Sequence, residues 1–194
     1  HLSEGDSTAA GFYKDSTANR NHGTLTDADG DSVAADGQLD GAFDFNGDAD
    51  RVDLSDIDII SGSISLWIKP GANATNNDGL VHKRASGAET DISLSVNMID
   101  TTTRVLAALY DGALKTADSV NAVGIGSWGY VVGTSEENGF LRMYLNGVLE
   151  AQTSMGVSAQ NNDIYRIGCV TDSTVGCLAG FFFDGIIDEV RIST

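Results

Sequence analysis

The carboxylate of Asp188 stands out among the residues of this sequence that could bind a ligand. It lies in a segment that alternates like a β-strand, where a two-residue period gives Asp188 the same face as Ile186, Val190 and Ile192. An ionised carboxylate is unfavourable on an apolar face unless a cation or hydrogen-bond donors meet it. A metal ion, the side chain of Arg51 or backbone amides would each satisfy this requirement.

Two cysteines form a second candidate pair. Cys169 and Cys177 flank the polar, turn-like stretch VTDSTVG, and cysteines that face each other across a hairpin tip can meet the geometry of a disulfide. Two free thiols in a reducing compartment are the alternative, while a zinc site would need more ligands than this pair offers. We expect a disulfide, which implies an extracellular or cell-surface location.

Residues for catalysis do not form a set. No predicted strand carries the alternating carboxylates with which sandwich-fold glycoside hydrolases flank a glycosidic bond. His1, His22 and His82 form neither a zinc pair nor a triad with an evident nucleophile. We therefore expect a protein that is not an enzyme.

The charge of the chain excludes several partners. With 28 acidic and 11 basic residues, its net charge of −17 repels nucleic-acid phosphates and anionic lipid. No apolar run is long enough to cross a bilayer. We expect no nucleic-acid partner and no direct membrane insertion. The aspartate-rich composition fits either divalent-cation binding or a salt-adapted surface.

Short alternating segments must position these side chains. Strands are predicted at 63–69, 91–97, 140–146 and about eight further places, with Gly, Asn and Asp clusters between them. The dipeptide of Asn146 and Gly147 predicts a two-residue hairpin. Only residues 114–122 have a weak helical pattern. The sequence predicts an all-β, antiparallel two-sheet jelly-roll sandwich, and residues 1–194 without repeat or linker predict a single domain.

Several segments occur in an order that resembles the laminin-G-like, concanavalin A-like jelly-roll domains of bacterial and archaeal surface proteins. The segments are HLSEGDST, DSTANRNHGTLT, GAFDFNGDADRVDL, SISLWIKP, WGYVVGT, RMYLNGVLEA and FFDGIIDEVRIS. The resemblance covers essentially the whole chain, although the cysteine pair is not part of the general pattern. It implies a convex and a concave antiparallel sheet, with the first and last strands as neighbours.

The resemblance also implies a structural calcium ion at the seam between the first and last strands. Asp188 would bind it together with Glu4 and a backbone carbonyl at Asn46 or Gly47. Hard oxygen ligands of this kind suit Ca²⁺ better than a transition metal. Asp15 is a further candidate, although an aspartate that opens a turn usually caps its own backbone.

Members of this broad fold often bind carbohydrates, through an aromatic platform and planar polar groups. The polar faces of the predicted strands supply such residues: Trp67, Asn97, Tyr110, Arg142, Tyr144 and Asn146. Trp67 shares its face with serines and a lysine rather than with the isoleucines of the same strand. It either lines a groove on a concave sheet or packs beneath a covering loop.

Two functions from different classes follow. The first is a non-catalytic, calcium-stabilised carbohydrate-binding or adhesion module of a larger extracellular protein, with glycans or cell-surface polysaccharide and neighbouring domains as partners. The alternative is a structural domain that spaces or displays its neighbours in a surface or virion assembly. An exposed aromatic in a groove favours the first function, whereas a groove plugged by loops favours the second. Because the chain starts at His1 without a methionine, we expect a fragment or a processed product.

Overall fold

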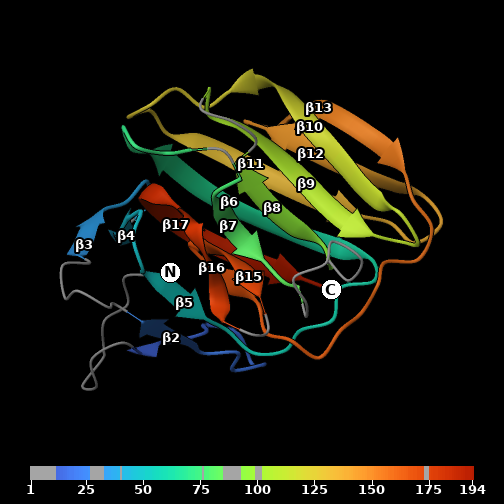
Figure 1. Cartoon of the computed structure of the whole chain (residues 1–194), viewed down its shortest axis with the longest axis horizontal. Coiled ribbons are helices and arrows are strands. Elements are labelled where there is room, and N and C mark those ends of the chain that lie inside the picture. The colour runs from blue at the N-terminus through green and yellow to red at the C-terminus, as the bar shows by residue number, and fades with distance from the viewer. Residues whose placement is uncertain are drawn as a thin grey trace.

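The structure, a computed structural model, describes residues 12–26, 33–39, 41–75, 77–84, 93–98, 102–172 and 175–194. Two large antiparallel sheets pack face to face in these residues (Figure 1). The predicted all-β sandwich is therefore confirmed. No described segment forms a helix that is long and apolar enough to cross a membrane.

Seventeen strands make up the described part of the chain. They are β1 (Phe12–Tyr13), β2 (Gly23–Thr26), β3 (Val33–Asp36), β4 (Gly41–Asn46), β5 (Arg51–Asp53), β6 (Gly62–Pro70), β7 (Gly79–His82), β8 (Ser95–Met98), β9 (Arg104–Tyr110), β10 (Leu114–Ala122), β11 (Gly129–Ser135), β12 (Phe140–Leu145), β13 (Val148–Ser154), β14 (Arg166–Ile167), β15 (Cys169–Asp172), β16 (Gly176–Phe182) and β17 (Asp184–Ser193). Sheet A has the order β1-β2-β5-β14-β7-β8-β9-β10, and sheet B has the order β13-β12-β11-β6-β17-β4-β3. Strands β15 and β16 form a separate hairpin.

Period-two alternation decides which side chains enter the core between the sheets. In β6, Ile64, Leu66 and Ile68 have no exposed surface, while Trp67 points to the opposite side. Sheet A contributes buried residues at the same period: Val81, Val96, Ala107, Leu109 and Ile167. Burying each large aliphatic side chain stabilises the fold by about 1.5–3 kcal/mol. The side of each sheet away from this core is its outer face.

The predicted hairpin at Asn146 and Gly147 is confirmed. Both residues have positive φ, 52° and 81°, as the mirror-image turns that suit twisted hairpins require, and they join β12 to β13. The weak helical pattern at 114–122 is wrong, because this segment is strand β10 and pairs with β9. Ala117 and Ser119 of β10 are buried two residues apart, which is the period of a strand.

Edge strand β10 of sheet A and edge strand β13 of sheet B lie side by side (Figure 1). The register of β10 with β9 shifts between Asp118 and Ala122. At this irregularity the Glu150 carboxylate of β13 accepts hydrogen bonds from the backbone amides of Val120, at 3.1 Å, and Asn121, at 2.9 Å. Edge strands with free amides invite pairing with other chains. Glu150 therefore protects this edge.

Halfway along strand β17, the alternation between side chains that face the core and side chains that face outward shifts by one residue. Its register with β6 is Ile187 opposite Ile68, Asp188 opposite Trp67, Arg191 opposite Ser65, and Ile192 opposite Ile64. One extra residue in β17 produces a bulge, and Glu189 there has a φ of +51°. Ile187 and Ile192 consequently both face the core. The expectation that Asp188 shares a face with Ile192 is wrong, because uniform alternation does not allow for a bulge. Asp188 lies on the outer face of sheet B.

Candidate functional site

Two aromatic rings lie together on the outer face of sheet B. Trp67 of β6 is opposite Tyr130 of β11 in the sheet register. Their ring centroids are 5.1 Å apart, with the planes inclined by 42°. Both side chains keep part of their surface exposed. Trp67 is thus not packed between the sheets and can offer ring surface to a ligand.

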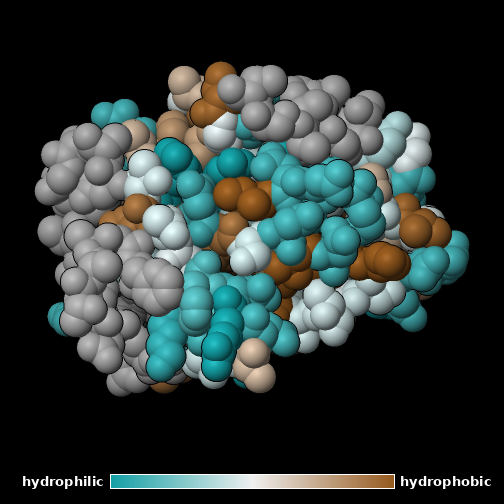
Figure 2. Space-filling view, turned by 90° about the horizontal axis from the view of Figure 1, so that it is seen from below, coloured by the Kyte–Doolittle hydropathy of each residue, from teal (hydrophilic) through white to brown (hydrophobic). Residues whose placement is uncertain are grey.

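A hollow of about 450 Å³ opens beside these rings. Its lining combines aromatic, polar and aliphatic residues: Tyr13, Lys14, Asp15, Ser16, Thr17, Asn19, Asn21, Gly23, Leu39, Val52, Leu54, Ile57, Ser65, Trp67, Tyr130, Ile167, Glu189, Val190, Arg191 and Ile192. Strands β2 and β5 lie at the lower side of Figure 1, and the view from that side shows hydrophobic surface exposed among hydrophilic residues (Figure 2). Such a mixed lining suits a ligand that has apolar faces and polar edges.

The turn between β1 and β2 forms a preordered rim of the hollow. The carboxylate of Asp15 accepts hydrogen bonds from the backbone amide and hydroxyl of Thr17 and from the amide of Asn21, each at 2.8 Å. Partial burial raises the pKa of Asp15, but the hydrogen bonds from Thr17 and Asn21 outweigh it and leave the pKa lowered. Asp15 therefore caps its own turn. The sequence had suggested this role as the alternative to metal binding.

Three other predicted ligand residues, two in strand β12 of sheet B and one in the turn after it, lie outside the lining of the hollow. Tyr144 and Arg142 project from β12 on the outer face, where Arg142 stacks on Phe140 at 5.0 Å and pairs with Glu136 at 3.1 Å. The side-chain oxygen of Asn146 accepts a hydrogen bond from the Tyr130 amide at 2.9 Å. These contacts give Arg142 and Asn146 roles within the protein itself.

Asn97 and Tyr110 lie on the other sheet. Asn97 is in β8 and Tyr110 ends β9, and both strands belong to sheet A. The structure therefore does not bring the six predicted residues together, and only Trp67 lines the hollow. Alternation indicates which side of its own strand a residue occupies, but not which sheet that strand joins.

Sequence reasoning missed Tyr130, Tyr13 and Arg191, which also line the hollow. For Tyr130 a signal was present, because the alternation of β11 buries Val131 and so directs Tyr130 outward. Arg191 carried no usable signal, since its facing depends on the bulge in β17.

Asp188 is fully buried and accepts three backbone hydrogen bonds. Its Oδ2 atom accepts from the amides of Gln38, at 2.8 Å, and Leu39, at 3.0 Å, and its Oδ1 atom accepts from the amide of Glu189 at 2.7 Å. A Cβ atom at Gly37 would lie 2.6 Å from Oδ2, so this turn needs glycine. Arg51 bonds Asp53 instead, at 3.1 Å. Of the three partners considered, backbone amides meet Asp188, and they fasten the β3–β4 turn to sheet B.

The expected calcium ligands do not converge on Asp188 in the part of the chain that the structure describes. Asn46 is opposite Asp184 in the sheet, and Gly47 adjoins the same aspartate. Asp184 is four residues from Asp188 along β17, or roughly 13 Å at the rise of a strand. The described residues contain no group of three or more His, Cys, Asp or Glu side chains arranged to hold a metal. Glu4 lies outside the described residues.

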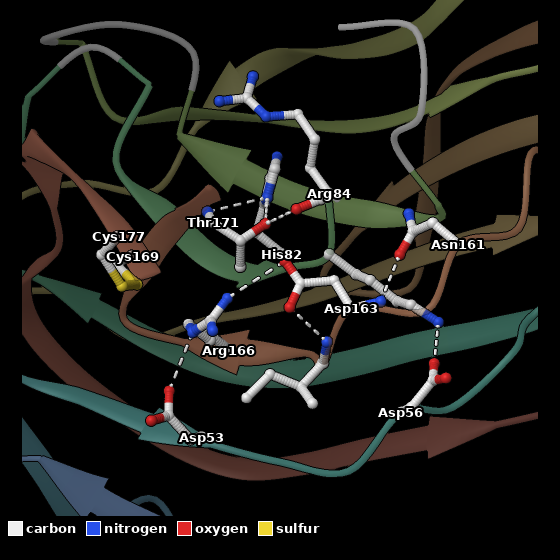
Figure 3. A network of polar contacts seen from close by, with 12 residues as sticks. Asp53, Asp56, His82, Arg84, Asn161, Asp163, Arg166, Cys169, Thr171 and Cys177 are labelled. Atoms are coloured by element: carbon white, nitrogen blue, oxygen red, sulfur yellow. Dashed lines mark hydrogen bonds and ion pairs between the residues drawn. A yellow bond between two sulfur atoms is a disulfide. The ribbon is translucent and has the colours of Figure 1, made fainter. Parts of the chain in front are cut away.

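A polar network lies around Asp163 and around His82 and Arg166 of sheet A (Figure 3). Nδ1 of His82, at the end of β7, lies 2.9 Å from the hydroxyl of Thr171 and accepts a hydrogen bond from the Thr171 amide at 3.2 Å. The pKa of His82 is lowered to about 3, mainly by burial and in addition by the positive charges of Arg84 and Arg166. His82 is therefore neutral at physiological pH. It binds the β15–β16 hairpin, in which Cys169 and Cys177 form the expected disulfide.

Ion pairs complete this network. Arg166 bonds Asp53 at 3.1 Å and lies 3.5 Å from Asp163. Lys83 points inward, is fully buried, and contacts the carboxylates of Asp56, at 2.6 Å, and Asp58, at 3.2 Å. The network therefore has a structural explanation for most of its charges.

Comparison with known proteins adds a family to this geometry. A family model described as the concanavalin A-like lectin/glucanases superfamily matches residues 45–194. No curated protein sequence matches the chain.

Solved structures share the fold across most of the chain. Domain 4 of AbnA, a GH43 extracellular arabinanase from Geobacillus stearothermophilus in complex with arabinotriose, is 23% identical with a TM-score of 0.70, covering 94% of this chain and 90% of that one. The CBM40 of the Ruminococcus gnavus IT-sialidase bound to α2,3-sialyllactose is 18% identical with a TM-score of 0.56, covering 70% and 76%. Domains LG4-5 of the mouse laminin α1 chain are 16% identical with a TM-score of 0.62, covering 79% and 42%. At these identities the similarity concerns the fold.

Proposed function

The chain belongs to the concanavalin A-like lectin/glucanase superfamily, and from this premise we propose that it is a non-catalytic carbohydrate-binding module of an extracellular protein. The hollow beside Trp67 is the proposed glycan site. The observation that carries this proposal is the pair of partly exposed rings, Trp67 and Tyr130, at the edge of a cavity lined by both polar and aliphatic residues. Aromatic faces stack on the apolar faces of sugar rings, and polar walls bond hydroxyl groups.

Further features support a binding module. Lys14 and Arg191 in the lining supply cationic donors, and Asn19 and Asn21 supply amides that can bond hydroxyl groups in either direction. Arabinotriose and sialyllactose accompany two proteins of the same fold, which makes oligosaccharides the appropriate first ligands to test. The disulfide supports an extracellular location.

Glycan binding is tested with a matched pair of substitutions on one sheet face. Titration of the wild-type protein with arabinotriose, sialyllactose and an array of oligosaccharides identifies a bound glycan. We expect Trp67→Ala to weaken that binding by about tenfold or more, because the stacking surface is lost. Tyr144→Ala is the control, since Tyr144 lies on the same outer face but outside the lining of the hollow.

The alternative, a structural spacer without a ligand, makes a different prediction for the same experiment. A spacer would bind no oligosaccharide, and Trp67→Ala and Tyr144→Ala would then behave alike. Equal loss of binding in both variants would also contradict the proposed site, because it would indicate a site that is not centred on the hollow.

Structural calcium stays part of the proposal as a separate expectation, in which Glu4 and Asp188 would share the ion. Wild-type protein should then melt at a higher temperature in CaCl₂ than in EDTA, and Asp188→Asn should abolish this difference. Identical melts with calcium and with chelator would limit Asp188 to its three amide bonds.

A further inference from the structure

Two positively charged side chains of the hollow are exposed to solvent. Lys14, in the turn after β1, and Arg191, in β17, both belong to the lining of the hollow. No ion pair among the residues that the structure describes includes either of them. Carboxylates are in large excess in this chain, with 28 acidic against 11 basic residues. These two cations nevertheless stay available to a ligand.

The bulge in β17 turns Arg191 toward the aromatic rings. Arg191 is opposite Ser65 in the sheet register, and Asp188 is opposite Trp67. Uninterrupted alternation would place Arg191 on the core side, three residues after the outward-facing Asp188, and the extra residue directs it outward instead. Glu189 makes the bulge with a φ of +51°, a conformation that is costly for residues other than glycine. Bulges that re-aim one side chain in this way are frequent next to functional sites.

Arg191 and Trp67 are diagonal neighbours on the outer face of sheet B. Ser65 and Trp67 are two residues apart in β6, so Arg191, opposite Ser65, lies one diagonal step from Trp67. Diagonal neighbours are about 7–8 Å apart, which is within reach of a long side chain. A sugar ring stacked on Trp67 would therefore carry its substituents within reach of the Arg191 guanidinium, whose planar fork matches the two oxygens of a carboxylate.

Two carboxylates also line the hollow, but both are partly withdrawn from it. The oxygens of Asp15 accept hydrogen bonds from Thr17 and Asn21 within their own turn. The Oε1 atom of Glu189 is buried. Neither acidic side chain is fully exposed, whereas Lys14 and Arg191 are. An anion that enters the hollow therefore meets cations that are more accessible than the carboxylates.

We propose that the hollow binds an acidic oligosaccharide, with a uronate ring stacked on Trp67 and its carboxylate held by Arg191. Lys14 adds a second positive charge from the turn between β1 and β2. This inference rests on the proposed glycan site and adds the chemical class of its ligand. The carboxylate forms two parallel, charge-assisted hydrogen bonds with the guanidinium, which a neutral sugar cannot form.

The test compares each acidic sugar with its own methyl ester. The probes are the trisaccharides of galacturonate and of glucuronate, and esterification keeps their rings and hydroxyl groups while it removes the charge. In isothermal titration calorimetry we expect an acid to bind roughly tenfold more tightly than its ester, because only the acid forms charge-assisted bonds. Trp67→Ala should weaken binding of both forms, since both stack on the ring.

Variants locate the recognition of the charge. Arg191→Gln should weaken binding of the acid by roughly tenfold and leave the ester unchanged, and Arg191→Lys should fall between, because lysine keeps the charge but not the fork. Lys14→Gln should weaken the acid by about threefold, as expected for an exposed point charge. Arg20→Gln is the matched control, since Arg20 is an exposed cation of the same turn that lies outside the lining. Unchanged binding of the ester also shows that each variant is folded.

The same measurements separate this inference from the proposed function. Equal affinities for acid and ester, or an Arg191→Gln variant that loses no more than Arg20→Gln, would overturn the uronate assignment. So would an Arg191→Gln variant that loses acid and ester equally. In each of these cases, ester binding that Trp67→Ala weakens would leave the glycan site in place. If none of the trisaccharides binds, the uronate assignment is wrong, and the oligosaccharide array decides whether the hollow binds another glycan.

Discussion

The outer faces of the two sheets differ in whether other segments of the chain cover their polar and aromatic side chains. On sheet A, the β15–β16 hairpin lies over His82, and the charges of Arg166 and Asp53 are paired. On sheet B, the rings of Trp67 and Tyr130 stay partly exposed beside a hollow. A polar group that a segment of the chain covers must be hydrogen-bonded within the fold, whereas an uncovered one stays available to a ligand.

The same contrast occurs between two neighbouring residues of sheet B. Asp188 and Trp67 are opposite each other in the sheet register. The β3–β4 turn covers Asp188, whose side chain has no surface exposed to solvent, while the side chain of Trp67 is partly exposed. Position on a strand face therefore does not separate a structural residue from a ligand-binding residue, but the presence of a covering segment does.

The largest effect should come from removing the covered carboxylate. Asp188→Ala leaves three backbone amides without their acceptor, and we expect it to lower the free energy of unfolding by about 3–5 kcal/mol in urea denaturation. Asp188→Asn keeps one acceptor oxygen and should have a smaller effect. A loss below about 1 kcal/mol for the alanine variant would show that water replaces the carboxylate and that the site is not truly covered.

The covered face of sheet A should show itself in the pH dependence of stability. The pKa of His82 is about 3 in the folded protein and about 6.5 in the unfolded chain. Between these values only the unfolded chain binds the proton, so stability falls as the pH drops below 6.5, by up to about 1.4 kcal/mol per pH unit. Above pH 6.5 His82 contributes no pH dependence.

His82→Asn keeps a hydrogen-bond acceptor but does not titrate. Urea unfolding of both proteins at pH 7.5, 6 and 5 should therefore give curves of stability against pH that diverge on acidification. Carboxylates titrate in both proteins and cancel in the difference. Parallel curves would mean that His82 is solvated enough to take up a proton in the folded state.

The smallest effect should come from an exposed carboxylate with the same chemistry as Asp188. Hydrogen bonds from the Asn121 side chain and amide lower the pKa of Glu150, which keeps part of its surface exposed. We expect Glu150→Gln to lower the free energy of unfolding by less than about 1 kcal/mol, because water can replace a surface partner. Size-exclusion chromatography at high concentration should show increased self-association through the freed edge. A loss as large as that of Asp188→Ala would contradict the distinction between covered and open carboxylates.

Much of the fold could be predicted from the sequence because alternation is local. The burial of Ile64, Leu66 and Ile68, the outward facing of Trp67 and the turn at Asn146 and Gly147 all follow from a period of two or from the φ preferences of two residues. The disulfide followed from two cysteines that flank a turn-like stretch.

The site could not be predicted in the same way, because it depends on which strands become neighbours. Tyr130 lies beside Trp67 because β11 pairs with β6. Asn97 and Tyr110 also lie on polar strand faces, but their strands, β8 and β9, belong to the other sheet. One additional residue in β17 reversed the facing of everything after Asp188. A periodic pattern carries no record of bulges, sheet order or covering turns, since these are set by packing between segments far apart in the chain. The sequence alone determined that Asp188 needs a partner, and only the tertiary structure decided that backbone amides of the β3–β4 turn provide it.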